Sequence, residues 1–165
     1  MKQMFYKCSS LESIKISSLN TTNVEDMSWM FSGCSSLKSI ELSSFNTMNV
    51  TKMNDMFSEC SNLKSIDLSS FNTTNVTDMR AMFYQCTSLK TVNLSSFDTP
   101  NVIDMSFMFF ECSSLESIDL SSFNTTNVFD MKYMFEKCLS LRKENVKIGQ
   151  NGKKILKALP SCIIF

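Results

Sequence analysis

The chain has 165 residues, no histidine, and sixteen basic against sixteen acidic side chains. The absence of histidine excludes the Ser-His and Cys-His pairs of nucleophilic enzymes, and three glycines leave no Gly-rich phosphate loop. The length is that of a single domain.

A repeat of 26 residues runs through most of the chain. It is marked by six cysteines: Cys8, Cys34, Cys60, Cys86, Cys112 and Cys138. Residues 60–85 (CSNLKSIDLSSFNTTNVTDMRAMFYQ) and 112–137 (CSSLESIDLSSFNTTNVFDMKYMFEK) are nearly identical. A period of this length predicts a solenoid, whose coils are stabilised by stacking on one another. We expect the six cysteines to form a structural column of reduced core thiols. Because none is in a C-x-x-C pair, we predict no metal site, and no cofactor is expected.

Each coil begins with a predicted strand. In residues 63–68 the apolar Ile66 and Leu68 alternate with polar residues, which is the pattern of a half-buried strand. Asn20, Asn46, Asn72 and Asn124 follow the strands, with Asp98 in the same column. We expect this column to form a structural ladder that bonds the backbone of the turn and of the neighbouring coil.

A helix is predicted over residues 75–83. Val76, Met79, Met82 and Phe83 would share one face, and Asn75 would cap the helix together with Asp78. The predicted fold class is therefore α/β: a right-handed solenoid with one short parallel β-strand and one short helix in each 26-residue coil.

The repeat resembles a known family. Leu63, Ile66, Leu68, Phe71 and Asn72 follow the leucine-rich-repeat motif, and the 26-residue unit with its Met-Phe-x-x-Cys segment is similar to BspA-like surface-protein repeats. The resemblance covers roughly residues 4–141. It implies a horseshoe-like solenoid that works in adhesion or protein–protein contact and has no enzymatic activity.

The strand side is the predicted partner-binding face. Its charged columns place small hydroxyl side chains between opposite charges, on a flat surface that water can wet. The candidate residues are Lys15, Glu41, Asp67, Asn93, Asp119, Lys38, Lys64 and Lys90. Trp29 and Tyr133 fall on the predicted helices, where exposed aromatics can be binding hot spots; simple packing is the alternative.

We divide the chain into a solenoid over residues 1–141 and a degenerate cap with a basic tail over 142–165. Residues 1–136 hold nine basic and fifteen acidic residues, whereas 137–165 hold seven basic residues and one acid. In the decaying repeat, Glu144 stands where isoleucine is expected and Val146 takes the following leucine column. The final residues, Cys162-Ile163-Ile164-Phe165, match the prenylation signal, so we predict a lipid on Cys162. The alternative is a tail that only covers the last coil.

These patterns predict a non-enzymatic interaction or adhesion module. No signal peptide is recognisable, so we expect synthesis in the cytoplasm and membrane association through the lipid and the basic tail. The expected partners are an unidentified protein and the membrane surface, without nucleic acid or a small-molecule substrate. Two alternatives stay open: a soluble scaffold whose basic tail binds acidic proteins or nucleic acid, and a fragment of an extracellular adhesin at the cell surface.

Overall fold

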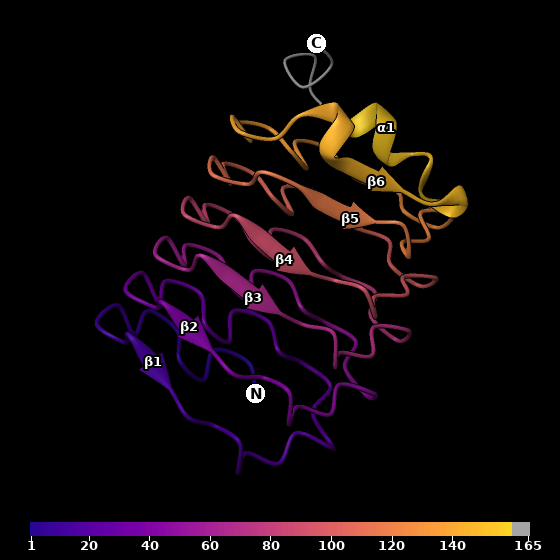
Figure 1. The fold of residues 1–165 in the computed structure, drawn as a ribbon. Coiled ribbons are helices and arrows are strands. Elements are labelled where there is room, and N and C mark those ends of the chain that lie inside the picture. Colours follow the sequence, from indigo (N-terminus) through magenta and orange to yellow (C-terminus); the bar gives the residue numbers. More distant parts are fainter. Residues whose placement is uncertain (160–165) are drawn as a thin grey trace.

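The chain winds into a stack of coils with a short strand on one side of each (Figure 1). A computed structural model describes residues 1–159. The strands are β1 (Ser13–Ile14), β2 (Ser39–Ile40), β3 (Ser65–Asp67), β4 (Thr91–Asn93), β5 (Ile118–Leu120) and β6 (Val146–Ile148). β1 pairs with β2, β3 with β4, and β5 with β6, all in parallel. The parallel strand solenoid expected from the sequence is confirmed; its right-handed winding stays a prediction.

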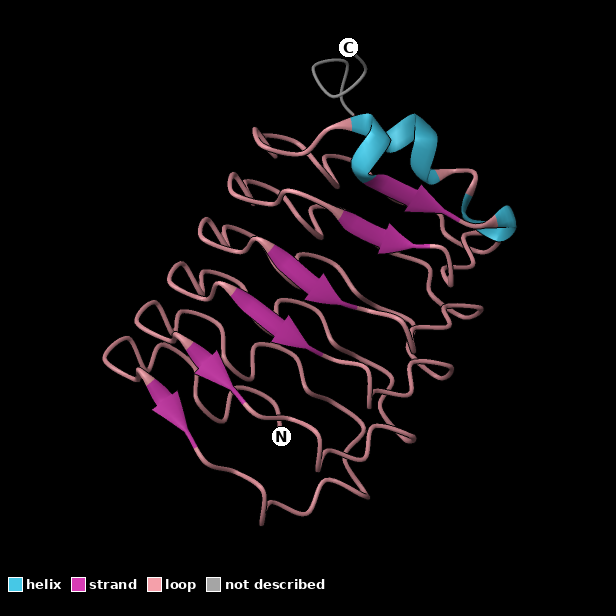
Figure 2. Ribbon diagram, viewed as in Figure 1, coloured by secondary structure: helices cyan, strands magenta, loops and turns pink. Residues whose placement is uncertain are grey.

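The helix predicted over residues 75–83 is wrong. Within residues 1–159 the only helical segments are η1 (Lys143–Asn145), η2 (Gln150–Gly152) and α1 (Ile155–Ala158), all beyond the regular repeat (Figure 2). Ala81 has φ 54°, in the left-handed region, which a right-handed helix does not contain. Asn75 does not cap a helix either, because its Nδ2 donates to the Met48 carbonyl of the preceding coil at 2.8 Å.

In place of each helix, the chain forms a series of overlapping turns that we call a turn ribbon. The ribbons comprise residues 1–7, 27–33, 53–59, 79–85, 105–111 and 131–137. Within a ribbon, the Met82 N–H donates to the Met79 carbonyl at 3.3 Å. The alternate amides point to the next coil, so Ala81 N–H donates to Ser106 C=O at 2.9 Å. A turn spans about the same three residues as a helical turn, which explains why the apolar spacing resembled that of a helix.

The interior is built from side-chain columns that repeat from coil to coil. One column stacks phenylalanine rings with centroids 5.3–5.7 Å apart and planes within 11° of parallel. Its members are Phe5, Phe31, Phe57, Phe83, Phe109 and Phe135. Methionines such as Met79 and Met82 are fully buried beside these rings. The core therefore grows with each coil, and the abundance of Met and Phe reflects repeated core positions.

A buried threonine column, missed in the sequence, links the coils where the chain turns after each strand. Thr73 Oγ1 donates to the Asp98 carbonyl at 2.7 Å and accepts from the Asp98 N–H at 3.0 Å. Asn72, which was expected to make such a link, accepts the Thr74 N–H at 3.0 Å within its own turn. The hydrogen bonds of the asparagine side chains thus support the role of this column in the turn, and threonine supplies the link between coils.

The cysteine column lies in the core. Cys60 Sγ donates to the Phe31 carbonyl at 3.3 Å, and Cys86 Sγ to that of Phe57 at 3.0 Å. Burial raises the pKa of Cys34 to about 11. Cys8, in the first coil, is exposed. Apart from Cys8, this column consists of protonated thiols shielded from solvent.

The last coil departs from the regular register. β6 pairs Val146 with Ile118 and Ile148 with Leu120, so the interval here is 28 residues. The placement of Val146 in the leucine column is therefore wrong. The short helix η1 accommodates the two additional residues, and Val146 takes the isoleucine column that Glu144 could not fill.

Replacing Thr73 by valine keeps the side-chain shape but removes both bonds to Asp98. We expect a loss of about 1–3 kcal/mol in the free energy of unfolding, because a buried donor and acceptor lose their partner. Urea denaturation followed by circular dichroism measures it. Thr74→Val is the matched control, since Thr74 is exposed. Equal midpoints for the two variants would contradict the role of the threonine column.

Thiol reactivity tests the cysteine column. In a Cys162→Ser variant, we expect Cys8 to be alkylated rapidly at mildly alkaline pH, whereas the buried thiols react only after denaturation. Mass spectrometry of peptides from the labelled protein identifies the modified residues. Rapid labelling of Cys86 in the folded chain would show that the coils are not packed as described.

Candidate interaction surface

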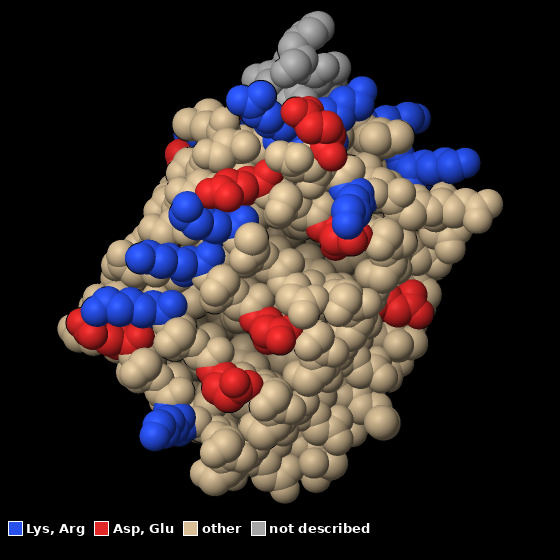
Figure 3. Space-filling view, in the orientation of Figure 1, with Lys and Arg blue, Asp and Glu red and all other residues tan. Residues whose placement is uncertain are grey.

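The predicted partner-binding face follows the strands. Lys15, Glu41, Asp67, Asn93 and Asp119 occupy one exposed column, which carries one lysine, three acids and one asparagine; Figure 3 shows basic and acidic side chains together on this side of the molecule. Several of these side chains also support the turns of their own coils. Asp67 Oδ1 accepts the Ser69 N–H at 2.9 Å, and this backbone bond lowers the pKa of Asp67.

The second column of this face consists largely of ion pairs. Lys38 Nζ lies 2.8 Å from Glu12 Oε2, and Lys90 Nζ lies 3.0 Å from Glu116 Oε1. Lys64 has no ion pair among residues 1–159. Pairs this exposed contribute little to stability. The face is therefore charged, most of its charges already have local partners, and Lys15 and Glu41 line a hollow of about 320 Å³ on it.

A second surface lies on the turn ribbons and consists of aromatic side chains. We call Tyr84, Phe107, Phe110 and Tyr133 the aromatic flank. Ring centroids are 5.1 Å apart for Tyr84 and Phe110, 5.7 Å for Phe107 and Phe110, and 5.1 Å for Phe107 and Tyr133. Tyr133 is 55% exposed. The rings support one another at the surface, so their positions are fixed without burial in the core.

The flank occupies the third and sixth positions of the turn ribbons, which are separated by two buried residues such as Met108 and Phe109. Trp29, Asp55, Ala81, Phe107 and Tyr133 are equivalent positions in successive coils. Their variation contrasts with the near-constant core columns. Trp29 and Tyr133 were predicted as candidate hot spots at these positions, and only Tyr133 joins the flank.

Tyr84, Phe107 and Phe110 were missed. Their signal in the sequence is that they are aromatic residues outside the repeated core columns. The signal was overlooked because each segment was interpreted within its own coil, whereas the ring contacts that define the cluster join Tyr84 to Phe110 and Phe107 to Tyr133 across successive coils.

A hollow opens beside the flank where the small Ala81 occupies the position of Phe107 in the next coil. Its volume is about 240 Å³, and Tyr84 and Phe107 form part of its wall. Arg80 Nη2 lies 2.7 Å from Asp55 Oδ2 at the same hollow. Burial raises the pKa of Asp55 although Arg80 opposes this shift. The hollow is large enough for one partner side chain.

Other site chemistries find no support in the described part of the chain. Residues 1–159 contain no group of three or more His, Cys, Asp or Glu side chains able to hold a metal ion. Over the same residues, no helix combines the length and apolar character needed to cross a membrane. Cys162, the predicted lipid attachment site, lies outside the described residues.

The fold is similar to a solved bacterial leucine-rich repeat protein. The protein, from Eubacterium ventriosum, is 21% identical with a TM-score of 0.51; the match covers 90% of this chain and 36% of that one. This chain thus spans about a third of that protein's length.

Two further solved structures are more distant. The Treponema pallidum leucine-rich repeat protein TpLRR is 18% identical, with a TM-score of 0.48 over 97% of this chain and 76% of that one. A leucine-rich cell surface protein from Faecalibacterium prausnitzii is 16% identical, with a TM-score of 0.38 over 93% and 55%.

The sequence also matches a protein family. No curated protein matches the chain. The family described as "Mycoplasma protein of unknown function, DUF285" matches residues 1–92 and again residues 64–155, which together span nearly all of the repeat. The chain therefore belongs to the DUF285 family, and its coils are leucine-rich repeats of the BspA-like type.

Proposed function

We propose that this chain is a non-enzymatic protein-interaction or adhesion module whose main contact surface is the aromatic flank. The observation that carries the proposal is the cluster of Tyr84, Phe107, Phe110 and Tyr133, fixed by mutual ring contacts at the surface of the turn ribbons. Aromatic side chains held rigidly at a surface lose little entropy on binding and are enriched among binding hot spots.

The strand face is the competing contact surface. Its predicted residues are charged, exposed and largely paired within the chain, as Lys90 is with Glu116. Charges at an exposed rim influence association rates more than affinity. We therefore assign the strand face a steering role and the flank the main binding energy.

For location, we propose the cell surface. The support is membership in a family of BspA-like repeats, which are surface-protein repeats. Lipid attachment at Cys162 with membrane association stays a second proposal and rests on the sequence motif alone.

A photo-crosslinking side chain tests the interaction surface. We expect benzoylphenylalanine at position 107 to form a discrete adduct with one protein, either from the cells that produce this chain or from the surface to which those cells attach. The same group at position 93, on β4, should form no such adduct. If adducts formed only from position 93, the partner-binding surface would be the strand face and not the aromatic flank. Adducts from neither position would contradict the interaction proposal.

Matched substitutions sharpen this test. Phe110→Ser should reduce the yield of the position-107 adduct by about tenfold, as expected for loss of a hot-spot aromatic. Lys64→Ser, on the strand face, should change it by less than about twofold. Both variants are checked for unchanged urea midpoints, so that a loss of adduct cannot come from unfolding.

The lipid proposal has its own measurement. If Cys162 is prenylated, the intact mass of the natural protein should show one isoprenoid, and Cys162→Ser should shift the protein from the membrane pellet to the supernatant. An unmodified Cys162 in the natural protein, or equal partition of the two forms, would rule out the anchor.

A further inference from the structure

The last turn ribbon, residues 131–137, has backbone donors that find no acceptor among residues 1–159. In the preceding ribbon, the Met105 N–H donates to the Asp130 carbonyl at 2.8 Å and the Phe107 N–H to that of Lys132 at 2.9 Å. The equivalent amides of Met131 and Tyr133, one coil later, have no acceptor among residues 1–159. Within residues 1–159 the chain departs from the repeat here, so the described part of the chain offers these amides no carbonyl one coil later.

The same edge offers no free carbonyl. The Lys132 carbonyl accepts the Phe107 N–H of the preceding coil, and the Tyr133 carbonyl accepts the Glu136 N–H at 3.2 Å. An ordinary β-strand presents donors and acceptors together, so it matches this edge poorly. An edge that only donates is instead complementary to an anion, because successive N–H groups concentrate positive potential.

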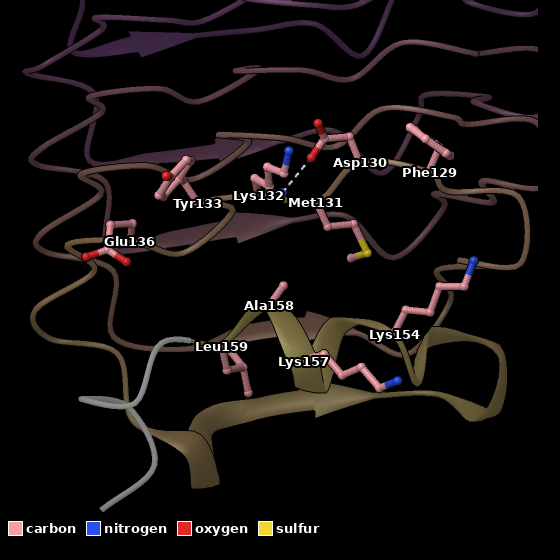
Figure 4. Close-up of a pocket in the computed structure, with 10 residues that line it drawn as sticks. All are labelled: Phe129, Asp130, Met131, Lys132, Tyr133, Glu136, Lys154, Lys157, Ala158 and Leu159. Atoms are coloured by element: carbon pink, nitrogen blue, oxygen red, sulfur yellow. Dashed lines mark hydrogen bonds between the residues drawn. The ribbon is translucent and has the colours of Figure 1, made fainter.

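A groove of about 360 Å³ runs along this edge, between the last ribbon and α1 (Figure 4). Met131 and Tyr133 line one wall, and Lys154 and Lys157 lie on the opposite side. Lys132 lies beside the two residues whose amides are free. The donors therefore face a space that is open to a ligand.

The charge of the groove is positive on balance. Lys132, Lys154 and Lys157 line it together with only two acids, Asp130 and Glu136. Asp130 Oδ1 is engaged locally, since it accepts the Lys132 N–H at 2.9 Å. Lys154 Nζ donates to the carbonyls of Thr126 and Val128 at 2.9 and 3.0 Å, which holds its ammonium at the rim.

Two exposed aromatics stand at opposite ends of the groove. Phe129 is 95% exposed and Tyr133 is 55% exposed, and Figure 4 shows them on either side of Lys132 and Met131. Within residues 1–159, no other aromatic ring contacts Phe129. Its ring therefore offers exposed apolar surface directly beside the charged groove.

We propose that this groove binds an acidic segment of a partner protein. Carboxylates of the segment accept hydrogen bonds from the Met131 and Tyr133 amides and pair with Lys132 and Lys157. Neighbouring apolar side chains of the segment pack on Phe129. Charge-assisted bonds of this kind are stronger than neutral ones and give an anionic motif both affinity and position.

A labelled peptide of alternating Asp and Gly, followed by fluorescence anisotropy at low salt, tests the proposal. We expect binding that weakens as salt is added and is absent for the Asn-Gly peptide. Lys157→Glu should weaken binding by at least about tenfold. Lys64→Glu makes the same charge change on the strand face and should alter it by less than about twofold. Equal effects of the two variants, or undiminished binding by Lys157→Glu, would overturn the proposal.

Amide NMR locates the bound peptide. The Met131 and Tyr133 N–H signals should shift on addition of the peptide, whereas those of Met105 and Phe107, already hydrogen bonded, stay in place. Shifts centred elsewhere would overturn the proposal. So would binding of inorganic phosphate as tight as that of the peptide, which would identify a small-anion site instead. The cross-linking at position 107 tests the aromatic flank and does not involve Lys157. The groove proposal, which rests on the proposed interaction function, can therefore fail while the adduct still forms, and the reverse also holds.

Discussion

The hydrogen bonds between successive turn ribbons are the constraint on which the rest of the structure depends. Amides such as Ala81 N–H donate to a carbonyl 25 residues ahead, and the bonds recur in every regular coil. A coil of another length would misalign these donors and acceptors. The fixed repeat length follows from this requirement. The columns of Phe, Met, Thr and Cys follow in turn, because aligned backbones place equivalent side chains on top of one another.

This backbone arrangement separates stability from recognition. The residue type of the buried ribbon side chains is constrained, because each stacks on its counterpart in the next coil, as Phe83 does on Phe109. Those that point outward carry no such restriction, which allows Ala81 and Phe107 to occupy equivalent positions. Differences between coils therefore accumulate on the ribbon surface. The aromatic flank and the hollow beside it are the result. The ribbon backbone positions both, and neither belongs to the buried core that stabilises the fold.

The sequence predicted the features that follow from alternating polar and apolar residues within a coil and from positions repeated in every coil. The strand around Ile66 and the core positions of the Phe column were visible in this way. The helix was wrong because turns and helices bring apolar residues to one side with similar spacing, and only the left-handed φ of residues such as Ala81 distinguishes them. Thr73 was overlooked because its two bonds reach another coil. The donor edge at Met131 was likewise invisible, since it arises where the register shifts at Val146.

The ribbon also explains why the two proposed surfaces differ in chemistry. Along the solenoid the ribbon amides that point to the next coil are paired, so recognition there falls to side chains; at Met131 and Tyr133 the equivalent amides have no acceptor among residues 1–159, and the backbone itself becomes available. Through-hydrogen-bond scalar coupling in NMR tests this account most directly. We predict a coupling between the Ala81 amide and the Ser106 carbonyl carbon. A coupling from Ala81 to the Thr77 carbonyl, four residues earlier, would show a helix and contradict the account.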